Sequence, residues 1–177
     1  MTSPPYANAI DYMRAHKFSL VWFGWSIDQL SQRRSEYIGT ERTKDWQART
    51  SWPPAVRQVL DSLNEVEPRR SRVVARYFDD MTSVLSEINR VLMPSCYAVL
   101  VVGPSTIRGI TVDTGKMLTA IASSLDSPLA LAGVAKRTID RDRRLLPATG
   151  RANLNSTIER RIHHESIICL QKTNSWV

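Results

Sequence analysis

Tyr97-Ala98-Val99-Leu100-Val101-Val102 is a continuous apolar run that is rich in β-branched residues. It ends at Gly103-Pro104, a pair that is typical of a turn. A short uninterrupted run of this composition indicates a strand that is buried on both faces of a sheet. We therefore expect residues 97–102 to lie in the interior of the fold.

The segments around this run alternate between helical and extended patterns. The clearest helix is expected at 73–92, because five large apolar residues recur there every three or four positions: Phe78, Met81, Leu85, Ile88 and Leu92. Similar spacing predicts three further helices, at 7–25, 54–64 and 114–125. Apolar runs predict two further strands, at 129–139 and 165–171. Helices and strands in this order indicate an α/β fold.

The aromatic residues of the expected first helix are interpreted as core residues. Trp22 and Trp25 fall on its broad apolar face, so we expect both to be buried. Cys96 and Cys169 each lie inside an apolar run and are expected in the core as well. Two cysteines at this separation form neither a metal-ligand spacing nor a disulfide framework.

Length and composition narrow the class of protein. The chain has 177 residues, which favours one domain, and 23% of them are charged. No window approaches the ~20 consecutive apolar residues of a membrane span. The first residues do not have the basic and then apolar pattern of a secretory signal peptide. Together with the few cysteines, this predicts a cytoplasmic protein without a metal site.

Charge suggests the first candidate partner. Lys plus Arg number 24 against 17 Asp plus Glu, and 19 of the 24 are arginines, whose planar side chains suit phosphate and guanine. Arginines gather in 26–75, expected as a basic insertion or arm, and in a basic loop at 140–155. We expect these two regions to contact double-stranded DNA through a set of six residues: Arg33, Arg34, Arg42, Arg141, Arg143 and Arg144.

The motif that bears on chemistry is Ser3-Pro4-Pro5-Tyr6. Two consecutive prolines exclude a helix interior or a central strand and fix the backbone in an extended corner. A hydroxyl and free carbonyls then stand on one side of the corner and an aromatic ring on the other. Such a corner can accept hydrogen bonds from an amine while the ring stacks on a flat base.

With these residues the chain resembles the amino-type DNA methyltransferases that use S-adenosylmethionine. The family's catalytic motif is Ser/Asp/Asn-Pro-Pro-Tyr/Phe at the end of the fourth strand of a class I sheet, and Ser3-Pro4-Pro5-Tyr6 matches it in full. The segments 7–22 and 36–42 look like those that follow the motif in one group of site-specific DNA methylases, the modification enzymes of restriction systems. Residues 87–103 look like the helix and fifth strand of the same fold.

The resemblance implies a Rossmann-like partial sheet, strands five to seven with flanking helices, in a single incomplete domain over 1–177. It implies that the Ser3 side chain and the Pro4 carbonyl accept from the exocyclic amine of a flipped-out base. Tyr6 would stack on that base, with Pro5 holding the corner rigid. The amine attacks the methyl group directly, so no cysteine adduct is needed. A Ser in the first position favours cytosine over adenine.

The sequence does not contain the features of the family's cofactor-binding half. No Gly-rich turn follows an apolar strand, and no acidic residue follows a second strand to hold ribose hydroxyls. Three interpretations stay open at this point. The chain is the C-terminal part of a methyltransferase, one subunit of a split enzyme whose second polypeptide supplies the cofactor site, or a non-catalytic basic module that binds DNA.

Overall fold

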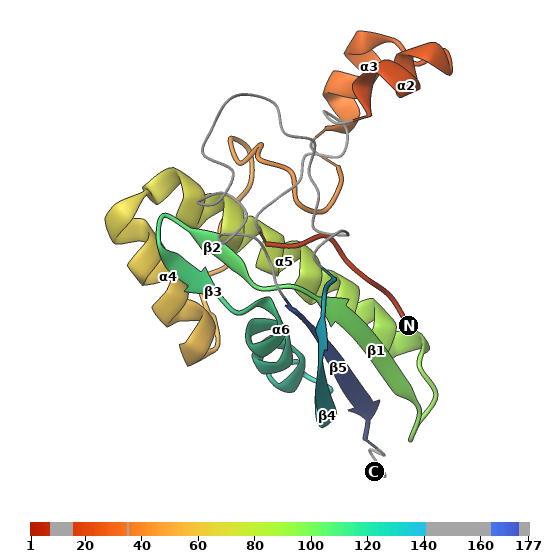
Figure 1. Cartoon of the computed structure of the whole chain (residues 1–177), viewed down its shortest axis with the longest axis vertical. Coiled ribbons are helices and arrows are strands. Elements are labelled where there is room, and N and C mark those ends of the chain that lie inside the picture. Colours follow the sequence, from red (N-terminus) through yellow and green to blue (C-terminus); the bar gives the residue numbers. More distant parts are fainter. Residues whose placement is uncertain (8–15, 35, 141–163, 174–177) are drawn as a thin grey trace.

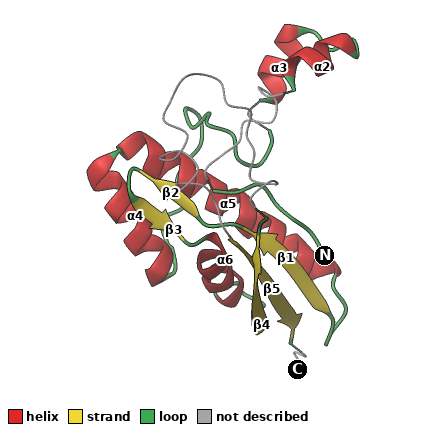
Figure 2. Cartoon of the chain, in the orientation of Figure 1, coloured by secondary structure: helices red, strands yellow, loops and turns green. Residues whose placement is uncertain are grey.

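The computed structural model describes residues 1–7, 16–34, 36–140 and 164–173. Its helices and strands are mixed along the chain (Figure 2), as the sequence predicts. The helices are α2 (Lys17–Trp22), α3 (Ile27–Arg33), α4 (Pro54–Val66), α5 (Pro68–Val91) and α6 (Thr114–Ser123). The strands are β1 (Tyr97–Val102), β2 (Ser105–Ile107), β3 (Ile110–Val112), β4 (Leu129–Thr138) and β5 (His164–Lys172). Every element expected from 54 onward is therefore present.

Three of the strands form an antiparallel sheet in the order β1-β5-β4. β5 lies in the middle, with Leu100 opposite Ile168 on one side and Val134 opposite Ile168 on the other. The register between β4 and β5 shifts once, between Leu131 and Gly133. A strand that comes late in the sequence thus holds together two strands that precede it.

The expectation that residues 97–102 are buried on both faces is wrong. Burial alternates along β1, so that Ala98, Leu100 and Val102 are buried while Tyr97 is 55% exposed. The reason is that helices pack on one face of this sheet. A strand in an antiparallel sheet needs only one buried face, and an apolar run does not reveal which arrangement holds.

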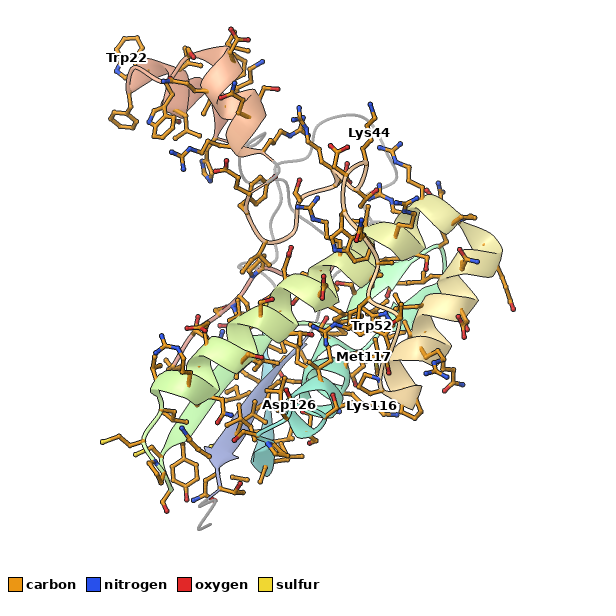
Figure 3. The ribbon with its side chains drawn as sticks, turned by 180° about the vertical axis from the view of Figure 1, so that it is seen from behind. Trp22, Lys44, Trp52, Lys116, Met117 and Asp126 are labelled. Atoms are coloured by element: carbon orange, nitrogen blue, oxygen red, sulfur yellow. The ribbon has the colours of Figure 1, made fainter. Side chains whose placement is uncertain are left out.

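Helices α4, α5 and α6 supply the other half of the core. Figure 1 shows α5 and α6 behind the strands, and the reverse view in Figure 3 shows them in front, so they cover one face of the sheet. Phe78 and Met81 of α5 and Leu118 of α6 are completely buried there together with Leu100 and Leu170. Burying side chains of this size contributes roughly 1.5–3 kcal/mol each to the stability of this helix–sheet interface.

The first expected helix, 7–25, is only partly described. Residues 8–15 lie outside the described residues, and α2 is six residues long and has no buried residue. Gly24, with φ +91°, ends the turn after it, and Ser26 caps α3 with its side chain and with Gln29. Figure 1 places α2 and α3 apart from the sheet. The sequence favoured one long helix because a three- to four-residue spacing persists across this break.

The expectation that Trp22 and Trp25 are core residues is therefore wrong. Trp22 is 88% exposed and Trp25 is 39% exposed. Figure 3 shows the Trp22 side chain at the outer end of α2, away from the helices that carry the core. Cys96 and Cys169 are also not core residues, since both are half-buried free thiols. Cys169 alternates with the buried Ile168 and Leu170 along β5, and Cys96 precedes β1, so apolar neighbours in sequence did not place either thiol in the core.

The structure adds a hairpin that the sequence analysis missed. β2 and β3 pair antiparallel, with Ser105 opposite Val112, across a two-residue turn. Arg108 and Gly109 make this turn with positive φ angles of 52° and 85°, the backbone that a tight hairpin requires. Arg108-Gly109 between two short β-branched runs was the available signal.

The range 26–75 contains more regular structure than an arm. α3, α4 and the first two turns of α5 lie in it, and Val56, Leu60 and Leu63 of α4 are buried in the core. The expected basic loop at 140–155 lies outside the described residues except for Asp140. Among the described helices, none combines the length and the apolar character that crossing a membrane requires.

Candidate functional site

The N-terminal segment lies beside β1 as a short parallel neighbour. The Thr2 N–H donates to the Val99 carbonyl at 2.9 Å, and the Val101 N–H donates to the Thr2 carbonyl at 3.0 Å. These two bonds form a parallel bridge between Thr2 and Leu100. The chain then leaves the sheet as the prolines begin, because Pro4 and Pro5 cannot donate to a ladder. The motif residues thus stand at the carboxyl end of β1.

Ser3 is exposed, and its hydroxyl donates to the Val101 carbonyl at 3.1 Å. Since its proton is directed into the protein, the oxygen presents its lone pairs outward as an acceptor. Pro4 is buried, and no hydrogen bond within the described residues engages its carbonyl. The corner therefore exposes the Ser3 hydroxyl as an acceptor, next to the carbonyl of the buried Pro4.

Tyr6 crosses over the end of β1 to reach β5. Its hydroxyl donates to Glu165 Oε1. Glu165 precedes Ser166, which pairs with Val102 at the end of β1, so this contact spans the carboxyl end of that strand. The Tyr6 side chain belongs to a half-buried residue.

Glu165 is a buried carboxylate, only 7% exposed. Its second oxygen, Oε2, accepts from Arg137 Nη2 and, at 3.1 Å, from Arg137 Nε. Burial raises the pKa of Glu165, but the hydrogen bonds from Tyr6 and Arg137 and the charge of Arg137 outweigh burial and lower it. The carboxylate is therefore ionised at neutral pH, with a separate partner on each oxygen.

Sequence reasoning missed Glu165 and Arg137 as parts of this site. The available signal was a single charge at the start of the otherwise apolar run Glu165-Ser166-Ile167-Ile168. Its partners lie 159 and 28 positions away, so the spacing along the chain could not identify them.

Three of the expected DNA-contacting arginines lie in the described residues, and they are placed at and after α3 rather than at this corner. Arg33 ends α3, is exposed, and pairs with Glu36 at 3.3 Å, while its guanidinium lies 5.9 Å from the Trp25 ring centre. Arg34 caps α3, and its carbonyl accepts from Thr40 at 2.5 Å. Arg141, Arg143 and Arg144 lie outside the described residues.

Arg42 makes hydrogen bonds that connect α3 with the segment after it. Its guanidinium donates to the Ser31 carbonyl at 2.7 Å and to the Ser31 hydroxyl at 3.0 Å. Its own carbonyl accepts from Arg76 of α5. Arg42 therefore ties α3 to the segment that follows and connects that segment to α5.

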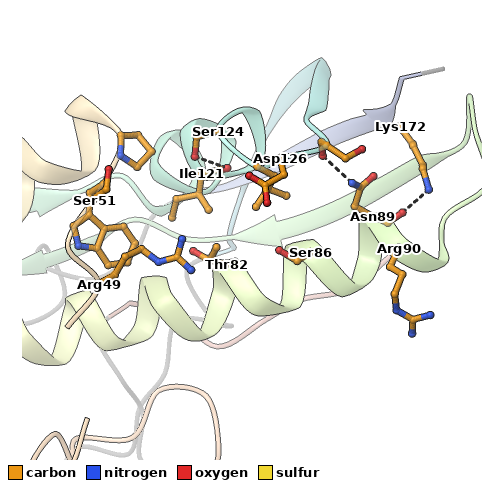
Figure 4. Close-up of a pocket in the computed structure, with 14 residues that line it drawn as sticks. Arg49, Ser51, Thr82, Ser86, Asn89, Arg90, Ile121, Ser124, Asp126 and Lys172 are labelled. Atoms are coloured by element: carbon orange, nitrogen blue, oxygen red, sulfur yellow. Dashed lines mark hydrogen bonds between the residues drawn. The ribbon is translucent and has the colours of Figure 1, made fainter. Parts of the chain in front are cut away.

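A groove of about 740 Å³ lies elsewhere, between α5, α6 and the segment 49–53 (Figure 4). Its cations already have partners: Arg49 pairs with Asp79 at 3.1 Å, Arg90 pairs with Glu87 at 2.8 Å, and Lys172 Nζ donates to carbonyls at the end of α5. Asn89 donates to the Ser127 carbonyl at 2.7 Å, and its buried side-chain oxygen has no partner among the described residues. Among the hydroxyls that line the groove, those of Thr82 and Ser124 donate to backbone carbonyls.

The described residues contain no Gly-rich turn after a strand, the feature that would hold S-adenosylmethionine in the family. Gly24 and Gly109 serve turns with positive φ, and Gly133 faces open space. Gly115 allows α6 to approach β5, since a Cβ there would come 3.1 Å from the Cβ of Ser166. Gly103 follows β1 directly, without a second glycine beside it. The same residues contain no group of three or more His, Cys, Asp or Glu side chains that could hold a metal ion.

Comparison of the chain with models of known families, with curated proteins and with solved structures finds no match in any of the three. The site is therefore interpreted from its own geometry.

Proposed function

We propose that this chain is the base-capturing part of an amino-type DNA methyltransferase. It holds the exocyclic amine of a flipped-out base, cytosine in preference to adenine, for methylation with S-adenosylmethionine as the donor. The residues that bind the donor belong to a cofactor-binding half outside this chain, in a preceding segment or in a second polypeptide. One observation carries the proposal: the Ser3–Tyr6 corner stands at the carboxyl end of β1, beside a parallel backbone bridge.

This location supports the proposal because the resemblance implies a motif at the end of a strand, the fourth of the sheet. Thr2 runs parallel to β1, and the motif begins at the next residue. A corner held by two backbone bonds and one side-chain bond to β1 is fixed relative to the sheet. Rigid placement of this kind is what substrate positioning requires.

The three-stranded sheet also supports it. The resemblance implies strands five to seven of a class I sheet, and the described sheet likewise has three strands. β5 lies antiparallel between β1 and β4. α6 connects β1 to β4 by way of the β2–β3 hairpin, which provides the crossover between them.

At the corner, the chemistry assigned to this chain is recognition and orientation of the base. The Ser3 hydroxyl and the Pro4 carbonyl accept the two N–H bonds of the amine, which aims the nitrogen lone pair away from the protein. Tyr6 supplies the stacking surface. Stacking on Tyr6 replaces the stacking on neighbouring bases that the flipped-out base loses when it leaves the duplex. The half-buried thiols of Cys96 and Cys169 take no part.

Transfer of labelled methyl groups to DNA tests the proposal. The chain is supplied with its cofactor-binding half, either fused as the segment encoded upstream of Met1 or co-expressed as a neighbouring polypeptide. Ser3→Ala is expected to lower turnover more than DNA affinity, because the lost acceptor acts on the reacting amine. Tyr6→Ala is expected to lower methyl transfer roughly ten- to a hundredfold through poorer base capture.

Cys96→Ala is the matched control and should leave methyl transfer intact. Loss of transfer in a folded Cys96→Ala protein, with Ser3→Ala unaffected, would contradict the amine mechanism. The second candidate is a non-catalytic basic DNA-binding protein, which is favoured because no Gly-rich turn follows a strand in the described residues. It predicts DNA binding that persists in both motif variants and no methyl transfer with any added half.

A further inference from the structure

Glu165 is the one buried carboxylate that contacts the motif among the described residues. It is 7% exposed, although an ionised carboxylate in such a place costs free energy unless it is paired. Its position is set by the sheet, since Glu165 lies directly opposite Arg137 in the β4–β5 register. The sheet thus presents a fixed acceptor at the carboxyl end of β1.

The two oxygens of this carboxylate have different tasks. Oε2 accepts twice from Arg137, and Oε1 accepts from the Tyr6 hydroxyl. The carboxylate cannot rotate toward one partner without weakening its bond to the other. A hydroxyl that donates to an ionised carboxylate forms a stronger and shorter bond than one that donates to a neutral acceptor. The hydroxyl end of the Tyr6 side chain is therefore held by Glu165, while its other end is held by the backbone.

We propose that Glu165 is a positioning residue, which holds the Tyr6 ring in the orientation that stacks on the captured base while Arg137 holds Glu165. This inference rests on the proposed function and deepens it. Glu165 does not touch the base; it acts through Tyr6. Anchoring both ends of a ring removes rotational freedom before the base arrives, and so lowers the cost of ordering on binding.

The test compares two DNA duplexes of the same sequence, one fully paired and one with a cytosine opposite an abasic site. The unpaired cytosine costs less to extrude, so base capture appears as tighter binding of the second duplex. For the full wild-type chain we expect the ratio of the two dissociation constants to be roughly tenfold or more. Glu165→Gln keeps the shape and removes the charge, and should bring the ratio close to one without changing affinity for the paired duplex.

Three variants make the test specific. Tyr6→Phe removes the same hydrogen bond from the other side without placing an amide in a buried position, and should lower the ratio as Glu165→Gln does. If Glu165→Gln does not fold, Tyr6→Phe still measures the effect of losing this hydrogen bond. Arg137→Lys keeps a cation beside Glu165 and should retain most of the ratio. Glu87→Gln changes an exposed carboxylate paired with Arg90 and should retain all of it.

The outcomes separate this inference from the proposed function. A wild-type ratio of one contradicts base capture itself, and with it the proposed function and the role of Glu165. A high wild-type ratio that persists in both folded Glu165→Gln and Tyr6→Phe overturns the positioning role alone. A lower melting temperature with an unchanged ratio does the same, since it assigns Glu165 a structural role only.

Discussion

Thr2 forms a parallel bridge with Leu100. Only backbone hydrogen bonds make this bridge, and they join Thr2 to Val99 and Val101, the residues on either side of Leu100. The Thr2 N–H donates to Val99 and the Thr2 carbonyl accepts from Val101, so the side chain at position 2 is not needed for the bridge. This bridge attaches the motif to the sheet.

Thr2→Pro removes the donor to Val99 and should lower the free energy of unfolding by about 1 kcal/mol, the usual net value of one hydrogen bond. Thr2→Ala keeps the N–H and should stay within ~0.5 kcal/mol of the wild type. Urea denaturation measures both. Equal stabilities of the two variants would mean that the bridge contributes nothing.

Two phenylalanines provide a matched pair for the core. Phe78 is completely buried between the helices and the sheet, whereas Phe18 in α2 is 87% exposed. Phe78→Ala should cost about 3–5 kcal/mol through lost burial and the cavity left behind. Phe18→Ala should change stability by less than ~0.5 kcal/mol. Thermal and chemical denaturation test this, and a comparable loss in both variants would place α2 in the core.

Acidification should act on the Glu165–Arg137 pair. The pKa of Glu165 in the folded protein lies below its ordinary value of 4.5, because its hydrogen bonds and Arg137 outweigh burial. Its contribution to stability is therefore complete above pH ~4.5 and is lost as the pH falls through the folded-state pKa. The free energy of unfolding should fall less steeply below this pH in Glu165→Gln than in the wild type. Parallel pH profiles of the two proteins would contradict this.

DNA binding should depend strongly on salt, since charge neutralisation supplies it. Both side chains of the Arg33–Glu36 ion pair are exposed, so the pair contributes little to the stability of the fold. Arg33 can therefore exchange Glu36 for a phosphate. Arg33→Gln should reduce the slope of log affinity against log salt by about 1. Binding titrations at several salt concentrations measure the slope. Affinity that does not change with salt, or no binding at low salt, would exclude this partner.

The isolated chain should bind S-adenosylmethionine weakly or not at all. The reason is that no Gly-rich turn follows a strand in the described residues. Calorimetric titration of the purified chain tests this. A micromolar dissociation constant would show that this chain contains a cofactor site of its own.

Sequence patterns predicted those elements whose burial is decided by neighbours along the chain. α5 and α6 follow from apolar residues every three or four positions, and β4 and β5 from short apolar runs. The patterns failed where distant packing decides. The apolar spacing around Trp22 could not show that α2 lies apart from the sheet, and the run 97–102 could not show that helices cover only one of its faces.

The candidate site divides in the same way. The Ser3–Tyr6 corner was predictable because proline stereochemistry is local. The contact of Tyr6 with Glu165 was not, because it depends on the register between β1 and β5, which brings the two ends of the described chain together. Nothing within a few residues of Tyr6 indicates a carboxylate partner.

The order of the strands also bears on how the protein is made. β5 occupies the middle of the sheet but is synthesised after β1 and β4. Until the ribosome has released residues 164–172, both earlier strands have an unpaired edge, and Leu131 and Val134 of β4 are apolar residues on such an edge. Nascent chains with exposed edges and long-range pairings fold slowly and are prone to aggregate. Expression that supplies chaperones should therefore raise the soluble yield.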